Sequence, residues 1–255
     1  MSIDPMQEIR AVLAGRPRFT GDNVALAREK AEEVGRQNQP TGDVTATPVD
    51  LGGVAAEWVA SSASRNDRVL LYFHGGGYFM GSLSTHRDRV ARLMAAAGCV
   101  ALSVDYRMAP EHPFPAAVED AAGAYGWLLA QGIEPQHIAV GGDSAGGGLA
   151  MALLVHLRDE GLQLPSAGLL LSPWVDLEVD SESAVSRAHQ DPMLEPEELR
   201  TMGRVYLDGQ NPRHPLASPL HADLAGLPPL LVQVGTAEIL HDDATRLVDK
   251  VREAG

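Results

Sequence analysis

The chain has 255 residues, enough to bury a large core, and we expect one α/β domain rather than two small ones. Its 20 basic and 34 acidic side chains give a formal net charge of −14, which argues against nucleic acid and anionic membrane surfaces as partners. No run of residues approaches the roughly 20 consecutive apolar residues that cross a bilayer.

The N-terminal part of the chain predicts two helices and then a hairpin. Residues 1–5 lack the basic stretch followed by an apolar stretch that marks a signal peptide, so we expect a soluble cytoplasmic protein. Residues 6–14 and 22–37 have the pattern of amphipathic helices. Two β-like stretches, 44–49 and 54–60, follow, and the glycine-containing turn between them predicts a hairpin.

From residue 68 onward, strand patterns alternate with helical patterns. The predicted strands are 69–73, 99–104, 138–142, 167–171 and 230–234, and the predicted helices between the first four are 84–97, 115–130 and 145–160. Such alternation predicts an α/β fold with a mostly parallel sheet, helices on both faces, and ligands at the carboxyl ends of the strands. The single cysteine, Cys99, begins one of these strands, so we expect a buried thiol, no disulfide and a reducing compartment.

A long insertion separates the last two predicted strands. Residues 174–226 are rich in Pro, Asp and Glu and contain one helical stretch around 195–207. We expect this insertion to cover part of the site together with the N-terminal helices. The chain would then divide into an N-terminal helical cap, residues 1–40, and a catalytic α/β domain, residues 41–255.

Two glycine-rich segments, each directly after a predicted strand, indicate an acyl-transfer site. The second is Gly142-Asp143-Ser144-Ala145-Gly146, which fits G-x-S-x-G, a pattern that exposes a serine hydroxyl on a sharp turn between a strand and a helix. The first is His74-Gly75-Gly76-Gly77, which fits the loop that offers backbone N–H groups to an oxyanion. Each segment alone is a moderate signal, whereas both together, in this order, are a strong one.

The residue types in these segments match what ester hydrolysis needs, namely a nucleophile, a base, a group that orients the base, and oxyanion donors. Ser144 is the predicted nucleophile, and the helix that begins at Ala145 directs its positive dipole end toward the site. The predicted oxyanion donors are the N–H groups of Ala145, Gly76 and Gly77, since glycine lets the backbone approach a substrate without a Cβ in the way. We expect Asp143 to be held in hydrogen bonds of the turn.

The orienting acid is expected after the nucleophile, because the chain order in this arrangement is Ser, then Asp or Glu, then His. Glu238 lies in the loop that follows strand 230–234, at the carboxyl end of the sheet, and is the predicted acid. Asp242 and Asp243 remain alternatives, although acidic residues at these positions also suit the first turn of a helix.

Four segments together resemble the motifs of a known family. In chain order they are HGGGY at 74–78, DYRMAPEHPFP at 105–115, GDSAGG at 142–147 and GTAEILHDD at 235–243. They resemble the hormone-sensitive-lipase-like (family IV) branch of the α/β-hydrolases, bacterial carboxylesterases with an N-terminal cap, over about residues 40–255. Asp is commoner than Glu at the acid position of that family. The resemblance implies an α/β-hydrolase fold, hydrolysis of short- to medium-chain esters or of lactones, a small-molecule ester as partner and no cofactor. It also allows a homodimer formed through an edge strand.

The base histidine of that family stands on a loop after one more helix and one more strand beyond the acid. Here the predicted helix from Asp242 to about Glu253 is followed only by Ala254 and Gly255, so we expect this chain to lack the base, as a truncated chain would. Removal of the base from such a triad lowers kcat about 10⁶-fold, so we expect the 255-residue chain to be nearly inactive. His241 is the alternative base within the chain, although a surface position on the helix is its plainer interpretation.

A non-catalytic protein that binds a small molecule on the same scaffold is the alternative function. The plant gibberellin receptors resemble this family, keep the serine and lack the base histidine. They replace one side chain and keep the fold complete, whereas the loss of an entire strand would expose the edge of its neighbour. A purpose-built receptor is therefore the weaker hypothesis.

The remaining candidates concern the pocket and the histidines. The residues that we expect to line the acyl or alcohol pocket, with core packing as the alternative, are Tyr78, Phe79, Trp174 and Met193. We expect His74 to brace the oxyanion loop and His86 to be exposed near the start of its helix. No histidine spacing suggests metal ligands, and the glycine patterns do not match nucleotide-binding loops, so we predict neither a metal nor a nucleotide site.

Overall fold

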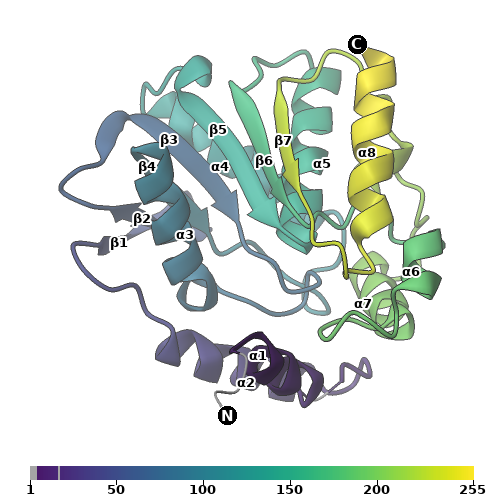
Figure 1. Ribbon diagram of the computed structural model, residues 1–255. Coiled ribbons are helices and arrows are strands. Elements are labelled where there is room, and N and C mark those ends of the chain that lie inside the picture. Colours follow the sequence, from purple (N-terminus) through teal and green to yellow (C-terminus); the bar gives the residue numbers. More distant parts are fainter. Residues whose placement is uncertain (1–4, 17) are drawn as a thin grey trace.

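The computed structural model describes residues 5–16 and 18–255, which form a seven-stranded sheet with helices on both faces (Figure 1). Residues 1–4, where the predicted cap begins, and Pro17 lie outside the described residues. The strands are β1 (Thr45–Asp50), β2 (Ala55–Ala60), β3 (Arg65–Phe73), β4 (Cys99–Val104), β5 (Ile138–Asp143), β6 (Ala167–Leu171) and β7 (Leu230–Gln233). The helices are α1 (Pro5–Ala14), α2 (Val24–Gln37), α3 (Leu83–Ala97), α4 (Ala116–Ala130), α5 (Ala145–Asp159), α6 (Glu182–Ser186), α7 (Pro196–Leu207) and α8 (His241–Ala254), with short 3-10 turns η1 (Pro135–His137) and η2 (Pro219–His221).

The order of strands across the sheet is β1-β2-β4-β3-β5-β6-β7. β1 and β2 form the predicted antiparallel hairpin, and Asp50 accepts hydrogen bonds from the N–H groups of Gly52 and Gly53 in its turn. β2 is antiparallel to β4, and the pairs from β4 through β7 are parallel. The predicted α/β fold is therefore confirmed, with element ends within a few residues of the sequence prediction.

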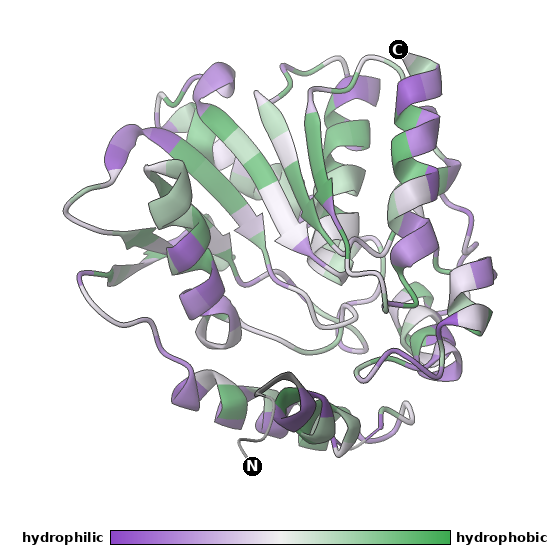
Figure 2. Ribbon diagram, in the orientation of Figure 1, coloured by the Kyte–Doolittle hydropathy of each residue, from purple (hydrophilic) through white to green (hydrophobic). Residues whose placement is uncertain are grey.

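Successive side chains of β3 pack into different layers. Leu70 and Tyr72 belong to a small core beneath α3, whereas Leu71 and Phe73 belong to the larger core that α4, α5 and α8 help to enclose. Figure 2 shows the resulting distribution, with hydrophobic strands in the sheet and hydrophilic stretches on the outer helices. Residues 65–68 at the start of β3 are exposed, which explains why the apolar pattern predicts only the buried second half of this strand.

The N-terminal helices lie at the carboxyl ends of the parallel strands, on the same side as α7 of the insertion (Figure 1). Arg28 of α2 ties them to the body of the protein: its Nε donates to the Phe79 carbonyl at 2.7 Å and its Nη2 to the Ala109 carbonyl at 2.9 Å. The same guanidinium pairs with the Glu111 carboxylate at 2.7 Å. Over the described part of the chain, no helix is both long enough and apolar enough to cross a membrane.

Candidate active site

Ser144 occupies the sharp turn between β5 and α5 with φ 52° and ψ −121°, a conformation that a non-glycine residue rarely adopts. Its N–H donates to the Leu171 carbonyl at 2.9 Å, and its own carbonyl accepts from the Trp174 N–H at 2.9 Å. The flanking Gly142 and Gly146 have no room for a Cβ, which at either position would overlap backbone atoms. The serine is therefore held in a strained position by β6 and the segment after it.

The loop after β3 offers backbone donors beside this turn. Gly76 and Gly77 have φ of 126° and 63°, and a Cβ on Gly77 would lie 2.7 Å from the Met202 sulfur. Among the described residues, the N–H groups of Gly76, Gly77 and Ala145 have no hydrogen-bond acceptor. A ligand oxygen in this region could accept hydrogen bonds from N–H groups that donate to no other group in the described protein.

Asp143 joins the serine turn to the glycine loop. Its Oδ1 accepts from the Tyr72 hydroxyl at 2.7 Å and from the Gly75 N–H at 3.1 Å. Its Oδ2 lies 3.3 Å from Nε2 of His86 and contacts the Arg89 guanidinium. Burial alone would raise the pKa of Asp143, but these charged and hydrogen-bonding partners hold it well below its ordinary value. Asp143 thus connects the Ser144 turn to β3, to the glycine loop and to α3.

His86 departs from the sequence expectation. We expected an exposed side chain, but only 14% of it is exposed, because it faces Asp143. The helix begins at Leu83, one residue before the predicted start, and is capped by Ser82: the Ser82 hydroxyl accepts from the Thr85 N–H, and the Thr85 hydroxyl accepts from the Ser82 N–H. His86 therefore lies on the side of α3 that faces Asp143.

His74 is fully buried beneath the glycine loop. Its Nδ1 lies 2.8 Å from the Gly75 carbonyl oxygen, which can only accept, so Nδ1 carries the proton. The ring stacks on Tyr106 with centroids 4.4 Å apart, and the Tyr106 hydroxyl donates to the His74 carbonyl at 2.7 Å. Burial lowers the pKa of His74 to about 4, so the ring is neutral at pH 7. These contacts match the expected bracing role of this side chain.

Three candidate acids follow β7, and they face different parts of the molecule. Glu238 is half-buried, accepts from the Gly235 N–H at 2.8 Å and lines the same cavity as Ser144. Asp243 is buried away from that cavity, where its Oδ2 accepts from the Val175 and Asp176 N–H groups. The Asp242 carboxylate accepts from the Ser183 N–H of α6, and the Asp242 N–H donates to the Ser183 hydroxyl. Glu238 is thus the acid that the structure brings to the cavity.

The cavity at the carboxyl ends of the strands has a volume of about 590 Å³. Ser144, Glu238 and the glycine loop line one part of it. The apolar side chains that line the rest are Ala31, Met80, Leu171, Met193, Leu194, Leu199, Met202, Val234 and Leu240. Mostly apolar walls with a few convergent polar groups are typical of small-molecule sites.

Three of the four predicted pocket residues lie in the core instead. Tyr78 stacks on Tyr206 with ring centroids 3.8 Å apart, and Phe79 stacks on Phe19 at the same separation. Trp174 is fully buried, with its indole N–H donating to the Asp176 carbonyl. These aromatic side chains point away from the cavity because they fill the core beneath its loops. Met193 lines the cavity, as expected.

The histidines do not complete a triad within the described chain. None of those described forms a hydrogen bond or ion pair with Ser144 or Glu238. His86 is the one described histidine that lines the cavity, and its Nε2 faces Asp143. His241, the alternative base, lies outside the cavity lining, with Nδ1 3.3 Å from the Asp242 carboxylate.

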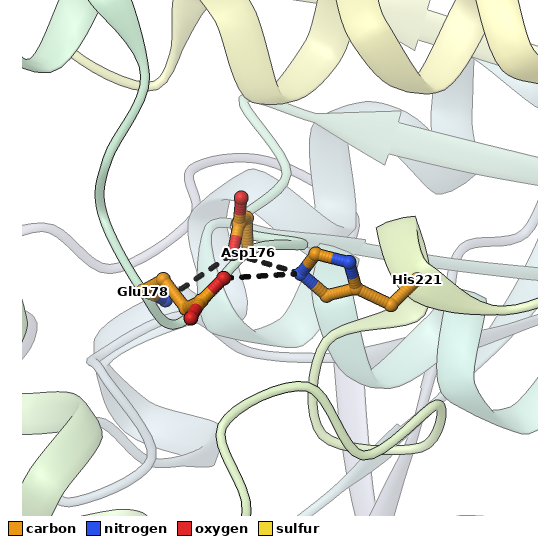
Figure 3. Close-up of side chains that lie close together, drawn as sticks. All are labelled: Asp176, Glu178 and His221. Atoms are coloured by element: carbon orange, nitrogen blue, oxygen red, sulfur yellow. Dashed lines mark hydrogen bonds and ion pairs between the residues drawn. The ribbon is translucent and has the colours of Figure 1, made fainter.

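A second polar cluster lies outside the cavity (Figure 3). Asp176, Glu178 and His221 place one potential metal-ligand atom each within 4.8 Å of one another. No sequence pattern indicates this cluster, because His221 comes more than 40 residues after the two acids. Arg246 and Arg213 already pair with these carboxylates at 3.1 and 2.7 Å. We therefore interpret the cluster as an ion-pair network that joins the segment after β6 to η2 and α8.

Comparison with known proteins agrees with this geometry. The family model described as alpha/beta hydrolase fold matches residues 70–255. An acetyl-hydrolase of Streptomyces hygroscopicus is 48% identical over 90% of this chain and 76% of its own length. An esterase of Acinetobacter venetianus is 41% identical over 81% of this chain and 68% of its own length.

Solved structures give the same result. A crystal structure of an esterase from the bacterial hormone-sensitive lipase family matches with TM-score 0.94 and 46% identity, over 100% of this chain and 86% of that one. The esterase EstE5, soaked with p-nitrophenyl butyrate, matches with TM-score 0.94 and 43% identity, over 99% of this chain and 86% of that one. The chain therefore belongs to the α/β-hydrolases, in the hormone-sensitive-lipase-like branch of carboxylic ester hydrolases.

Proposed function

We propose that the protein hydrolyses short- to medium-chain carboxylic esters, and lactones of similar size, through an acyl-enzyme on Ser144. The observation that carries the proposal is the strained Ser144 turn opening into one cavity with the glycine loop and Glu238. The soaking of EstE5 with p-nitrophenyl butyrate supports an ester of this size as the test substrate.

In this mechanism, Ser144 attacks the ester carbonyl and the developing oxyanion accepts from the N–H groups of Gly76, Gly77 and Ala145. That these N–H groups lack acceptors among the described residues supports the assignment. Removal of one such donor typically lowers transition-state stabilisation by about 3–4 kcal/mol. A base histidine takes the Ser144 proton and gives it to the leaving alcohol; the same base then deprotonates a water that attacks the acyl-enzyme, which releases the carboxylic acid and returns the proton to Ser144.

Glu238 is proposed to orient a base histidine. Because no described histidine contacts Ser144 or Glu238, we propose that these 255 residues alone turn over esters very slowly. A protein that binds small molecules without turnover is the alternative, and nothing in the cavity specifically favours it. We also keep the homodimer as a proposal, which light scattering during size-exclusion chromatography would test.

The first experiment measures p-nitrophenyl butyrate hydrolysis by the 255-residue chain and by the same chain with a C-terminal extension that supplies a strand and a base histidine. We expect hydrolysis to rise by several orders of magnitude with the extension and to depend on Ser144. Ser172 is the matched control, because it lines the same cavity and also has a positive φ of 46°. Ser144→Ala should abolish the gain and Ser172→Ala should leave most of it.

Two results would contradict the proposal. Equal activity of Ser144→Ala and the parent in the extended protein would exclude the acyl-enzyme. Rapid Ser144-dependent turnover by the 255-residue chain would show that a histidine within it, such as His241, acts as the base.

A further inference from the structure

We infer that the cavity favours esters that carry a second, ionised carboxylate, and that Arg89 recognises this group; the inference rests on the function proposed above. Arg89 lies on α3 and lines the cavity with Ser144. About half of its side chain, 49%, is exposed. Among the described residues that line the cavity, it is the only Arg or Lys.

The guanidinium of Arg89 is fixed beside the oxyanion loop. Its Nη1 contacts Oδ2 of the buried Asp143 carboxylate. The same Oδ2 lies 2.5 Å from where a Cβ on Gly75 would stand, so the guanidinium is next to the first glycine of the loop. A cation held in this way loses little conformational freedom when it binds a ligand, which favours recognition.

Arg89 keeps hydrogen-bonding capacity for a ligand. A guanidinium has five N–H donors, and Asp143 is its only carboxylate partner among the described residues. Asp143 in turn accepts from Tyr72 and Gly75 and faces His86, so its charge is shared among several partners. The Tyr72 hydroxyl also lies within hydrogen-bonding reach of Arg89. A guanidinium with N–H groups to spare can bind a carboxylate through two parallel hydrogen bonds.

The rest of the cavity defines the remainder of such a substrate. Its walls are mainly apolar, with Met193, Leu199 and Met202 on the side of the insertion. An apolar spacer would contact these side chains, while one end of the molecule meets the oxyanion donors and the other meets Arg89. The chemical class is thus a half-ester of a dicarboxylic acid.

The test compares two ligands that differ only at the far end. Monoethyl glutarate carries a carboxylate where ethyl pentanoate carries a methyl group. Their affinities are measured by isothermal titration calorimetry on the Ser144→Ala chain at pH 7, so that neither ligand is consumed. We expect the half-ester to bind at least about ten-fold more tightly, as a charge-assisted bidentate contact implies. Equal affinities would overturn the inference.

Variants of α3 then assign the preference to one side chain. In the Ser144→Ala background, Arg89→Gln should remove the preference, whereas Arg92→Gln should keep it, because Arg92 is 77% exposed and pairs with Asp88 on the surface. Retention of the preference in Arg89→Gln overturns the inference. If that variant does not fold, Arg89→Lys decides: its single ammonium should reduce the preference, and an unchanged ratio overturns the inference.

These measurements are independent of turnover. If hydrolysis does not depend on Ser144 while the carboxylate preference persists, the proposed function fails and the Arg89 subsite stands. If hydrolysis depends on Ser144 and the preference is absent, the subsite fails alone.

Discussion

The buried carboxyl group of Asp243 should make the free energy of unfolding depend on pH. Its carboxyl group is buried beneath the segment after β6, where Oδ2 accepts from the Val175 and Asp176 N–H groups. Burial raises its pKa to about 7, more strongly than these hydrogen bonds lower it. An unfolded chain gives an aspartate a pKa of about 3.9. The folded protein therefore binds the Asp243 proton more tightly than the unfolded chain does.

The direction and size of the effect follow from this difference. Because the protonated form is favoured in the folded state, Asp243 weakens the folded protein progressively as the pH rises from about 4 to about 7. Between about pH 5 and about pH 8, the loss amounts to about 2–3 kcal/mol of unfolding free energy. Asn at this position still offers an oxygen to both N–H groups and has no proton to lose.

Urea unfolding of the parent and Asp243→Asn at several pH values between these limits measures the effect. The stability of the variant relative to the parent should rise by about 2–3 kcal/mol across the range, whatever other groups titrate in both proteins. Asp249→Asn is the control, because it makes the same chemical change at an exposed position of the same helix. A pH-independent difference for Asp243→Asn would refute the reasoning.

Three further predictions concern the Ser144 turn, the N-terminal helices and the buried imidazole of His74. Gly146→Ala should lower the free energy of unfolding by more than about 2 kcal/mol, because the added Cβ would overlap the Phe73 carbonyl oxygen at the end of β3. Gly123→Ala is the control: this position on α4 has open space around it, so the substitution should raise the free energy of unfolding by about 0.5–1 kcal/mol, and urea unfolding measures both variants. Arg28→Met should make a protease cleave the N-terminal helices faster, since the substitution removes the hydrogen bonds of Arg28 to two carbonyls and its ion pair with a carboxylate. Unchanged cleavage in limited proteolysis would show that other contacts hold these helices. The ring protons of His74 should titrate near pH 4 by NMR, and a midpoint near 6.5 would contradict its burial.

Much of the fold could be predicted because local patterns determine it. The apolar runs of β3, β4 and β5 are continuous, as buried parallel strands require, and the helices between them show clear spacing. The glycine motifs also place Ser144 and Gly76 correctly at the carboxyl ends of strands, since such sharp turns admit few other residues.

Side-chain direction could not be predicted in the same way. Tyr78 and Phe79 follow the glycine loop directly, yet the positive φ of 64° at Tyr78 turns the chain so that both rings enter the core. His86 pairs with Asp143, a residue 57 positions later in the chain, and no local pattern encodes this contact. Likewise, only the tertiary fold separates Glu238, in the cavity, from Asp243, in the core.

The backbone of the Ser144 turn and the walls of the cavity belong to different parts of the fold. The turn is fixed by β5, β6 and α5, whereas Ala31 comes from an N-terminal helix and Met193 and Leu199 come from the insertion. Substitutions at these wall positions can therefore change which molecules fit while the geometry of the Ser144 turn stays constant. Such a division lets one scaffold diversify its substrates through its peripheral segments, while the sheet remains under strict structural constraint.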